Sequence, residues 1–146
     1  MPFPPHYSPG RGLKMSEVKF RIIGLDMATY KTGFCVLDCV GPGRFEVNSY
    51  GTLVSPDKED KTNKLRVMAE KIDGVIRAHS THPATFVASE SLISYGAVGS
   101  RINSLIPIAK LHGIVEYLEL QRGIILVHVA PSQVKKAVTG SGRASK

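Results

Sequence analysis

The chain has 146 residues, enough for one domain with a hydrophobic core of its own. Nineteen lysines and arginines against twelve acidic residues give a formal net charge of +7, which favours a polyanionic partner such as a nucleic acid. No apolar run approaches the roughly 20 residues of a membrane span, and the first ten residues contain no apolar signal core, which argues against membrane insertion and export.

Residues 1–16 differ in composition from the rest of the chain. They contain four of the nine prolines and little that a core could bury. We therefore expect a flexible, basic, proline-rich arm at 1–16 and one folded domain at 17–146, with Met15 as an alternative initiator.

Three consecutive strands are expected at about 19–26, 33–38 and 44–54. They are rich in β-branched, aromatic and other apolar residues, and a turn at Gly41-Pro42-Gly43 separates the second from the third. Connections this short imply an antiparallel meander. Asp38 ends the second strand at a hairpin, and we expect it to be exposed to solvent.

Cys35 and Cys39 lie four residues apart in the second of these strands. At ~3.3 Å per residue they would point to one face about 13 Å apart, too far for a disulfide. The chain has no Cys-x-x-Cys pattern that could hold zinc. We expect both to be core residues of a protein in a reducing compartment, which favours the cytoplasm.

Helices and strands alternate in the remainder of the chain. A helix is expected at 61–79, because apolar residues recur along one face, namely Leu65, Met68, Ile72, Val75 and Ile76. A strand at 84–89, a helix at 98–122, a strand at 123–128 and a short helix at 131–139 follow. The order βββαβαβα predicts an α/β domain with a mixed five-stranded sheet flanked by helices.

The expected helix at 98–122 carries two apolar stripes. One stripe contains Ile102, Leu105, Ile106, Ala109 and Gly113, and the other contains Ile108, Leu111, Val115 and Leu118. One can cover the sheet and the other favours a second subunit, so we expect a homodimer formed through this helix. Pro107 is expected to kink the helix or to restart it.

Two carboxylates each close an apolar strand. Asp26 ends the first strand, and Glu90 ends the fourth. A charge at the end of a buried strand is costly unless it meets a cation, and two such acids from one sheet can share a divalent metal such as Mg²⁺. Together with the positive net charge, this pair predicts phosphodiester chemistry on a nucleic acid.

The element order and the two strand-end acids resemble the ribonuclease-H-like fold, and the local sequences resemble the RuvC-type Holliday junction resolvases. Residues 23–26 and 32–37 look like the opening motif of that family. Residues 86–90 look like its second acidic strand, and 130–146 like its basic, glycine-rich segment. The resemblance covers about 18–146, which is nearly everything outside the predicted arm.

The resemblance implies two-metal hydrolysis of Holliday junctions or other branched DNA, with Mg²⁺, or Mn²⁺ as a substitute, and without a nucleotide cofactor. Asp26 would contact both metals and Glu90 one of them. Lys135 and Lys146 fall where the family places lysines near the cleaved strand, and Lys146 is a candidate catalytic residue. Tyr95 falls where the family reaches the junction core, and its ring could stack on an unpaired base.

Basic side chains elsewhere in the chain are expected to contact the DNA. The candidates are Arg101, Lys110, Lys135, Lys136, Arg143 and Lys146. The run Gly140-Ser141-Gly142 could present backbone N–H groups to a phosphate. Gly33 could permit a tight turn or a close approach of the DNA backbone, and a plain hairpin glycine would show the same pattern. His112 is expected at a helix interface rather than at the metal.

The chain departs from the family pattern at two points. Met27-Ala28 stands where the family usually has Pro-Gly after its first acid, which implies a different loop shape. No acid follows Glu119, although RuvC-like enzymes run on into a final helix that supplies further metal ligands. Asp26 and Glu90 alone would leave two metals with too few ligands, and we interpret the chain as a truncated resolvase.

Three alternatives stay open on the sequence. One is a non-catalytic protein of the same fold that binds branched DNA, which the missing C-terminal acids favour. Another is a resolvase-like nuclease that processes RNA, which would share fold and size. The third is a nucleotide-binding protein of the actin and sugar-kinase kind, which the short length and the Met27-Ala28-Thr29 loop disfavour.

Overall fold

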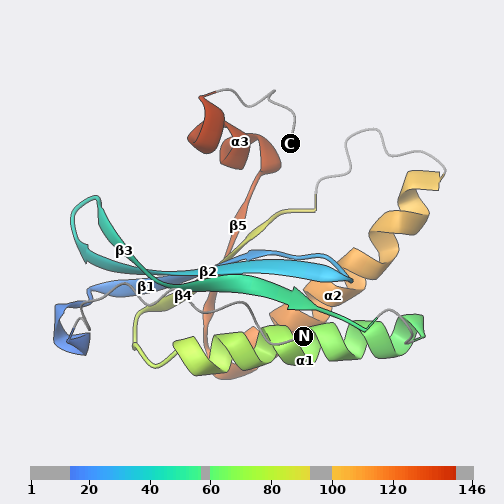
Figure 1. Cartoon of the computed structure of the whole chain (residues 1–146), viewed down its shortest axis with the longest axis horizontal. Helices are drawn as coiled ribbons and strands as arrows, with labels where there is room; N and C mark the ends of the chain where they lie inside the picture. Colours follow the sequence, from blue (N-terminus) through green and yellow to red (C-terminus); the bar gives the residue numbers. More distant parts are fainter. Residues whose placement is uncertain (1–13, 57–59, 93–99, 141–146) are drawn as a thin grey trace.

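The computed structural model describes residues 14–56, 60–92 and 100–140, with the side chains of 100–102 and 104 outside the description. Its centre is one five-stranded sheet with the order β3-β2-β1-β4-β5 (Figure 1). The strands are β1 (Phe20–Asp26), β2 (Lys31–Gly41), β3 (Arg44–Val54), β4 (Thr85–Glu90) and β5 (Ile125–Val129). The first three pair antiparallel, and β4 pairs parallel with both β1 and β5. The predicted mixed five-stranded sheet is confirmed.

Two long helices, α1 (Lys61–His79) and α2 (Ser100–Arg122), lie on one side of the sheet (Figure 1). The helix predicted at 61–79 has the predicted bounds, and Asp60 caps it by accepting a hydrogen bond from the backbone N–H of Asn63 at 2.7 Å. The core forms where these helices meet alternate strand residues. Its fully buried members include Ile23, Val36, Met68, Ile72, Ile76 and Leu111.

The opposite face of the sheet is more open. The short helix α3 (Pro131–Thr139) follows β5 and lies on the other side of the sheet from α1 (Figure 1). No residue of α3 is buried. Gly140 ends the helix with a left-handed backbone, φ 76°, which glycine adopts without steric cost.

The prediction that Asp38 is solvated is wrong. Asp38 is buried, at 3% exposure, because Arg21 lies directly opposite it in the β1–β2 register and points to the same core face. The Arg21 guanidinium donates from Nε to Asp38 Oδ1 at 2.6 Å and from Nη2 to Oδ2 at 3.0 Å. Burial opposes ionisation of Asp38, but the hydrogen bonds from Arg21 and Asn48 and the Arg21 charge hold its pKa below the usual value.

The structure also bears on three smaller expectations. Pro107 does not restart the helix, since α2 runs through it from Ser100 to Arg122. Gly33 is neither in a turn nor in a hairpin loop, because β2 begins two residues earlier. Within the predicted arm, Met15 and Ser16 belong to a short 3-10 turn, while 1–13 lie outside the described residues.

The cysteine prediction is confirmed in part. Both thiols are free, and Cys39 is buried as expected, whereas Cys35 is only half-buried. Among the described residues, no helix is both long and apolar enough to cross a membrane.

Candidate active site

Asp26 is the last residue of β1, and the register places it directly opposite Gly33 of β2. A Cβ on Gly33 would lie 3.8 Å from the Asp26 Cβ, so the two positions share one face of the sheet. Alternation along β1 turns Asp26 away from the buried side chains of Ile23 and Leu25. The Asp26 carboxylate is therefore exposed at the end of the more open face.

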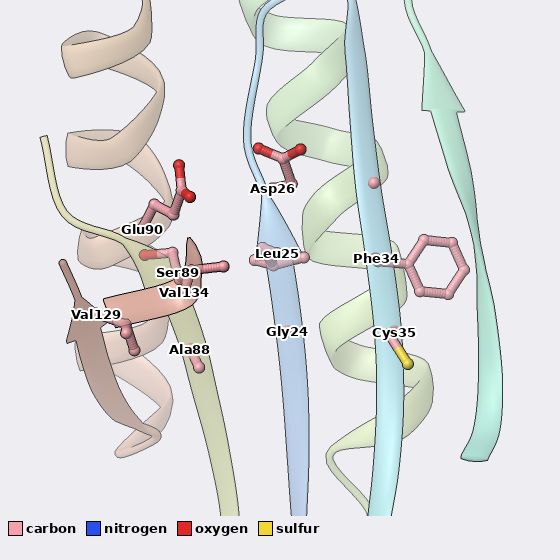
Figure 2. A pocket seen from close by; sticks show the side chains of 11 residues that line it. Gly24, Leu25, Asp26, Phe34, Cys35, Ala88, Ser89, Glu90, Val129 and Val134 are labelled. Atoms are coloured by element: carbon pink, nitrogen blue, oxygen red, sulfur yellow. The ribbon is translucent and has the colours of Figure 1, made fainter. Parts of the chain in front are cut away.

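Glu90 reaches the same edge of the sheet from β4. Because β4 runs parallel to β1, with Ser89 paired to Leu25, the carboxyl ends of the two strands lie side by side. Figure 2 shows the Asp26 and Glu90 carboxylates side by side above the strand ends, both pointing to the open edge. The structure thus brings together the two acids that the sequence singled out.

Both acids line a pocket of about 560 Å³ on the open face. Its floor is made by small or apolar residues of the central strands, including Gly24, Cys35 and Ala88, and Val134 of α3 closes one side (Figure 2). Burial raises the pKa of the Cys35 thiol, so this residue adds no charge near neutral pH. Among the described residues of the lining, the two carboxylates are the charged groups, and most of the others are apolar.

The donor set suits a hard cation. Two carboxylates with open space beside them match the way Mg²⁺ is usually bound, through one or two carboxylates, several waters and substrate phosphates. In the described part of the chain, no group of three or more His, Cys, Asp or Glu side chains converges on a common point. The described residues therefore fit one hydrated divalent ion and supply too few ligands for two.

The loop after Asp26 is ordered without the Pro-Gly pair. Thr32 Oγ1 donates a hydrogen bond to the Ala28 carbonyl at 2.9 Å and accepts one from the Ala28 N–H at 3.2 Å. The N–H of Ser55 donates to the Tyr30 carbonyl at 2.9 Å, which ties the same loop to the end of β3. This loop is thus held from both sides by hydrogen bonds.

The other predicted site residues either lie outside the pocket lining or fall outside the described residues. Lys110 is exposed on α2, Lys136 is exposed on α3 and Lys135 is half-buried there, and none of the three lines the pocket. Val134, the neighbour of Lys135, does line it, so α3 borders the site. Tyr95, Arg143, Lys146 and the side chain of Arg101 lie outside the described residues.

A second polar group lies behind β4, and the sequence did not single it out as a group. His128 Nε2 is 2.9 Å from Glu116 Oε1, and His128 Nδ1 is 3.4 Å from Ser89 Oγ, so β4, β5 and α2 are linked next to Glu90. His112 is buried beside them, which agrees with a helix interface. Burial lowers the pKa of His112, with Glu116 raising it and His128 lowering it further. The i, i+4 spacing of His112 and Glu116 was the available signal.

Comparison with known proteins decides the family. The family model described as "Crossover junction endodeoxyribonuclease RuvC" matches residues 22–146. This chain belongs to the RuvC family. It is 32% identical over 126 residues to the RuvC of Gloeobacter violaceus, which covers 86% of this chain and 68% of the relative. It is also 32% identical over 125 residues to the RuvC of Pseudothermotoga lettingae, covering 86% and 72%.

The fold comparison agrees with the family assignment. The structure of T. thermophilus RuvC in complex with a Holliday junction substrate superposes with a TM-score of 0.70 at 18% identity, covering 87% of this chain and 73% of that one. The ribonuclease-H-like α/β fold predicted from the sequence is therefore confirmed. This RuvC-family chain spans between 62% and 73% of the length of the curated relatives it matches.

Proposed function

We propose that this chain is a metal-dependent endonuclease that cleaves four-way or branched DNA in the cytoplasm. The observation that supports this most directly is the pairing of Asp26 and Glu90 at one edge of the sheet, in a chain whose family is defined by crossover junction endonucleases. The net charge of +7 suits a polyanionic substrate, which would be recognised mainly by shape and backbone charge.

Mg²⁺ is the proposed cofactor, with Mn²⁺ as a substitute, and Asp26 and Glu90 are its proposed ligands. A bound divalent ion would lower the pKa of a water and stabilise the leaving oxygen in an in-line displacement. The two carboxylates would hold the ion at the strand ends, and the apolar pocket floor would keep bulk water from the back of the site. Lys135, Lys136 and Lys110 are proposed contacts to DNA phosphates.

The test is cleavage of a labelled four-way junction beside a linear duplex of the same sequence. Wild type, Asp26→Asn and Glu90→Gln would be compared with Mg²⁺, with Mn²⁺ and with EDTA. Glu70→Gln is the matched control, because Glu70 is an exposed acid on α1 that pairs with Arg66 away from the site. We expect nicking of the junction that requires the metal and both strand-end acids, and that the control leaves unchanged.

The outcomes separate the proposed function from its main alternative. Junction-selective binding without cutting, under every metal condition, would mean that the chain is a branched-DNA-binding protein of the same fold. That alternative is favoured by one observation, the presence of only two carboxylates among the described residues at the site. Loss of any preference for the junction would refute both readings, and a preference for the matching RNA would favour an RNA-processing nuclease.

We further propose that the protein is a homodimer that uses α2. Of the two apolar stripes on α2, the one with Ile106, Ala109 and Gly113 is exposed at these three residues. Tyr117 and Leu120 extend this apolar surface with exposures of 60% and 71%. Light scattering should give the mass of a dimer for wild type and of a monomer for Leu120→Glu. A monomeric wild type at the concentrations used for cleavage would refute this proposal.

A further inference from the structure

We infer that Lys31 is a phosphate-binding residue of this site and that Tyr30 positions its side chain. The inference rests on the proposed function, because it concerns the DNA strand that would lie across Asp26 and Glu90. Lys31 belongs to neither the acid pair nor the basic segment, and its role follows from where the sheet places it.

The register puts Lys31 on the same face as Asp26. Asp26 is opposite Gly33, and Lys31 precedes Gly33 by two residues in β2, so both side chains leave the same face. Diagonal neighbours of this kind have Cα atoms about 7–8 Å apart, a distance that a lysine side chain spans. Lys31 is exposed, and its ammonium group can reach a phosphate bound above Asp26.

The environment of Lys31 leaves its charge available. Among the described residues, no carboxylate lies within 4 Å of the Lys31 ammonium. Its Nζ lies 5.6 Å from the centroid of the Tyr30 ring, within the range of a cation–π interaction. The Tyr30 carbonyl accepts a hydrogen bond from the Ser55 N–H, which holds the backbone from which the ring extends. The ring can therefore position the lysine side chain.

Charge balance explains why a cation is needed here. Two carboxylates at the strand ends repel a phosphodiester, and one divalent ion offsets their charge but leaves the DNA strand itself unneutralised. Lys31, on the same face as Asp26, supplies a positive charge for the DNA strand on the β2 side of the site. The helix α3 borders the pocket at a different place, through Val134. We therefore place the phosphate next to the scissile one, on the β2 side, against Lys31.

The experiment measures junction affinity as a function of salt, with Ca²⁺ in place of Mg²⁺. A protein that loses one phosphate contact should lose about one unit from the slope of log K against log salt. We expect this loss for Lys31→Ala and its absence for Lys31→Arg. Lys19→Ala is the matched control, because Lys19 is an exposed lysine at the other end of the sheet, just before β1.

Single methylphosphonates, which remove one phosphate charge at a time, then identify the contact. Wild type should bind less tightly when one phosphate near the crossover is neutralised, and Lys31→Ala should be insensitive to that same substitution. Tyr30→Phe should respond to this methylphosphonate as wild type does. Tyr30→Ala should lose less affinity than wild type on the same substitution, because the ring that positions Lys31 is gone.

The results distinguish this inference from the proposed function. If wild type shows no preference for the junction, both the proposed function and the role of Lys31 are overturned. If wild type binds and cuts junctions while Lys31→Ala and Lys19→Ala have the same salt slope, the proposed function stands and the role of Lys31 is overturned. An equal loss at every methylphosphonate position in both proteins would overturn it in the same way.

Discussion

Glu119 is the residue whose replacement should change the stability of this fold most informatively. Its side chain is completely buried where α2 packs on α1, and neither carboxylate oxygen has a hydrogen-bond partner among the described residues. The nearest cation, Arg122, has its Nη1 4.0 Å from Glu119 Oε1 and is shared with Asp73. Burial raises the pKa of Glu119 to about 7; Arg122 works against this and Asp73 adds to it.

The pH dependence follows from this raised pKa. Between the ordinary value of 4.5 and about 7, the folded protein holds a proton at Glu119 that the unfolded chain releases. The contribution of Glu119 to the free energy of unfolding therefore becomes more unfavourable as the pH rises through this window, and it stops changing above about pH 7. A difference of about 2.5 pKa units corresponds to a penalty of about 3 kcal/mol.

Glu119→Gln replaces the acid by a neutral group of the same shape. We expect this variant to be more stable than wild type by about 3 kcal/mol at pH 8.5, and the gain to shrink almost to zero by pH 4.5. Guanidinium unfolding followed by circular dichroism at pH values from 4.5 to 8.5 measures this difference. Titrating groups that do not interact with Glu119 cancel, because they are common to both proteins.

Glu70→Gln controls for the loss of one negative charge, since Glu70 is exposed on α1. It should shift stability by no more than about 1 kcal/mol at any pH. A Glu119→Gln difference that stays constant with pH would refute the reasoning, because it would show that Glu119 is ionised in the folded protein throughout.

Two further predictions concern β2. Asp38→Ala should lower the free energy of unfolding by about 3–5 kcal/mol, because it leaves Arg21 buried without its partner; a loss of about 1 kcal/mol in guanidinium unfolding would contradict this. Gly33→Leu should fold normally yet lower junction cleavage about 100-fold, since its side chain would enter the pocket beside Asp26, while Gly33→Ala, whose Cβ meets only ordinary contacts, should stay active. Equal activity of the two glycine variants in single-turnover assays would show that the space beside Asp26 is not used.

Local pattern was sufficient for the elements and for the acid pair. The alternation of apolar residues and the turn signals predict all five strands and the three helices in the correct order, with helix bounds within two residues. An acid at the end of an apolar strand is also a local feature. Because both acids end strands that the element order makes parallel, their meeting at one edge follows from topology alone.

The tertiary structure decided what depends on register. The burial of Asp38 follows from its position opposite Arg21, and a bulge in β3, where Asn48 has no register partner, accompanies the third contact of that carboxylate. The sequence likewise did not show that the Lys31 side chain lies on the same face of the sheet as Asp26.

The physical reason is that a side chain's charge environment is set by residues distant in sequence. Arg21 and Asp38 are 17 positions apart in the sequence, and a shift of one residue in register would turn every side chain of the strand to the other face. The same holds for Glu119, whose pKa is raised in part by Asp73 from another helix. The sequence by itself therefore determined the fold class and the strand-end acids. Which charges are buried, paired or available to a substrate was decided only when the strands and helices packed.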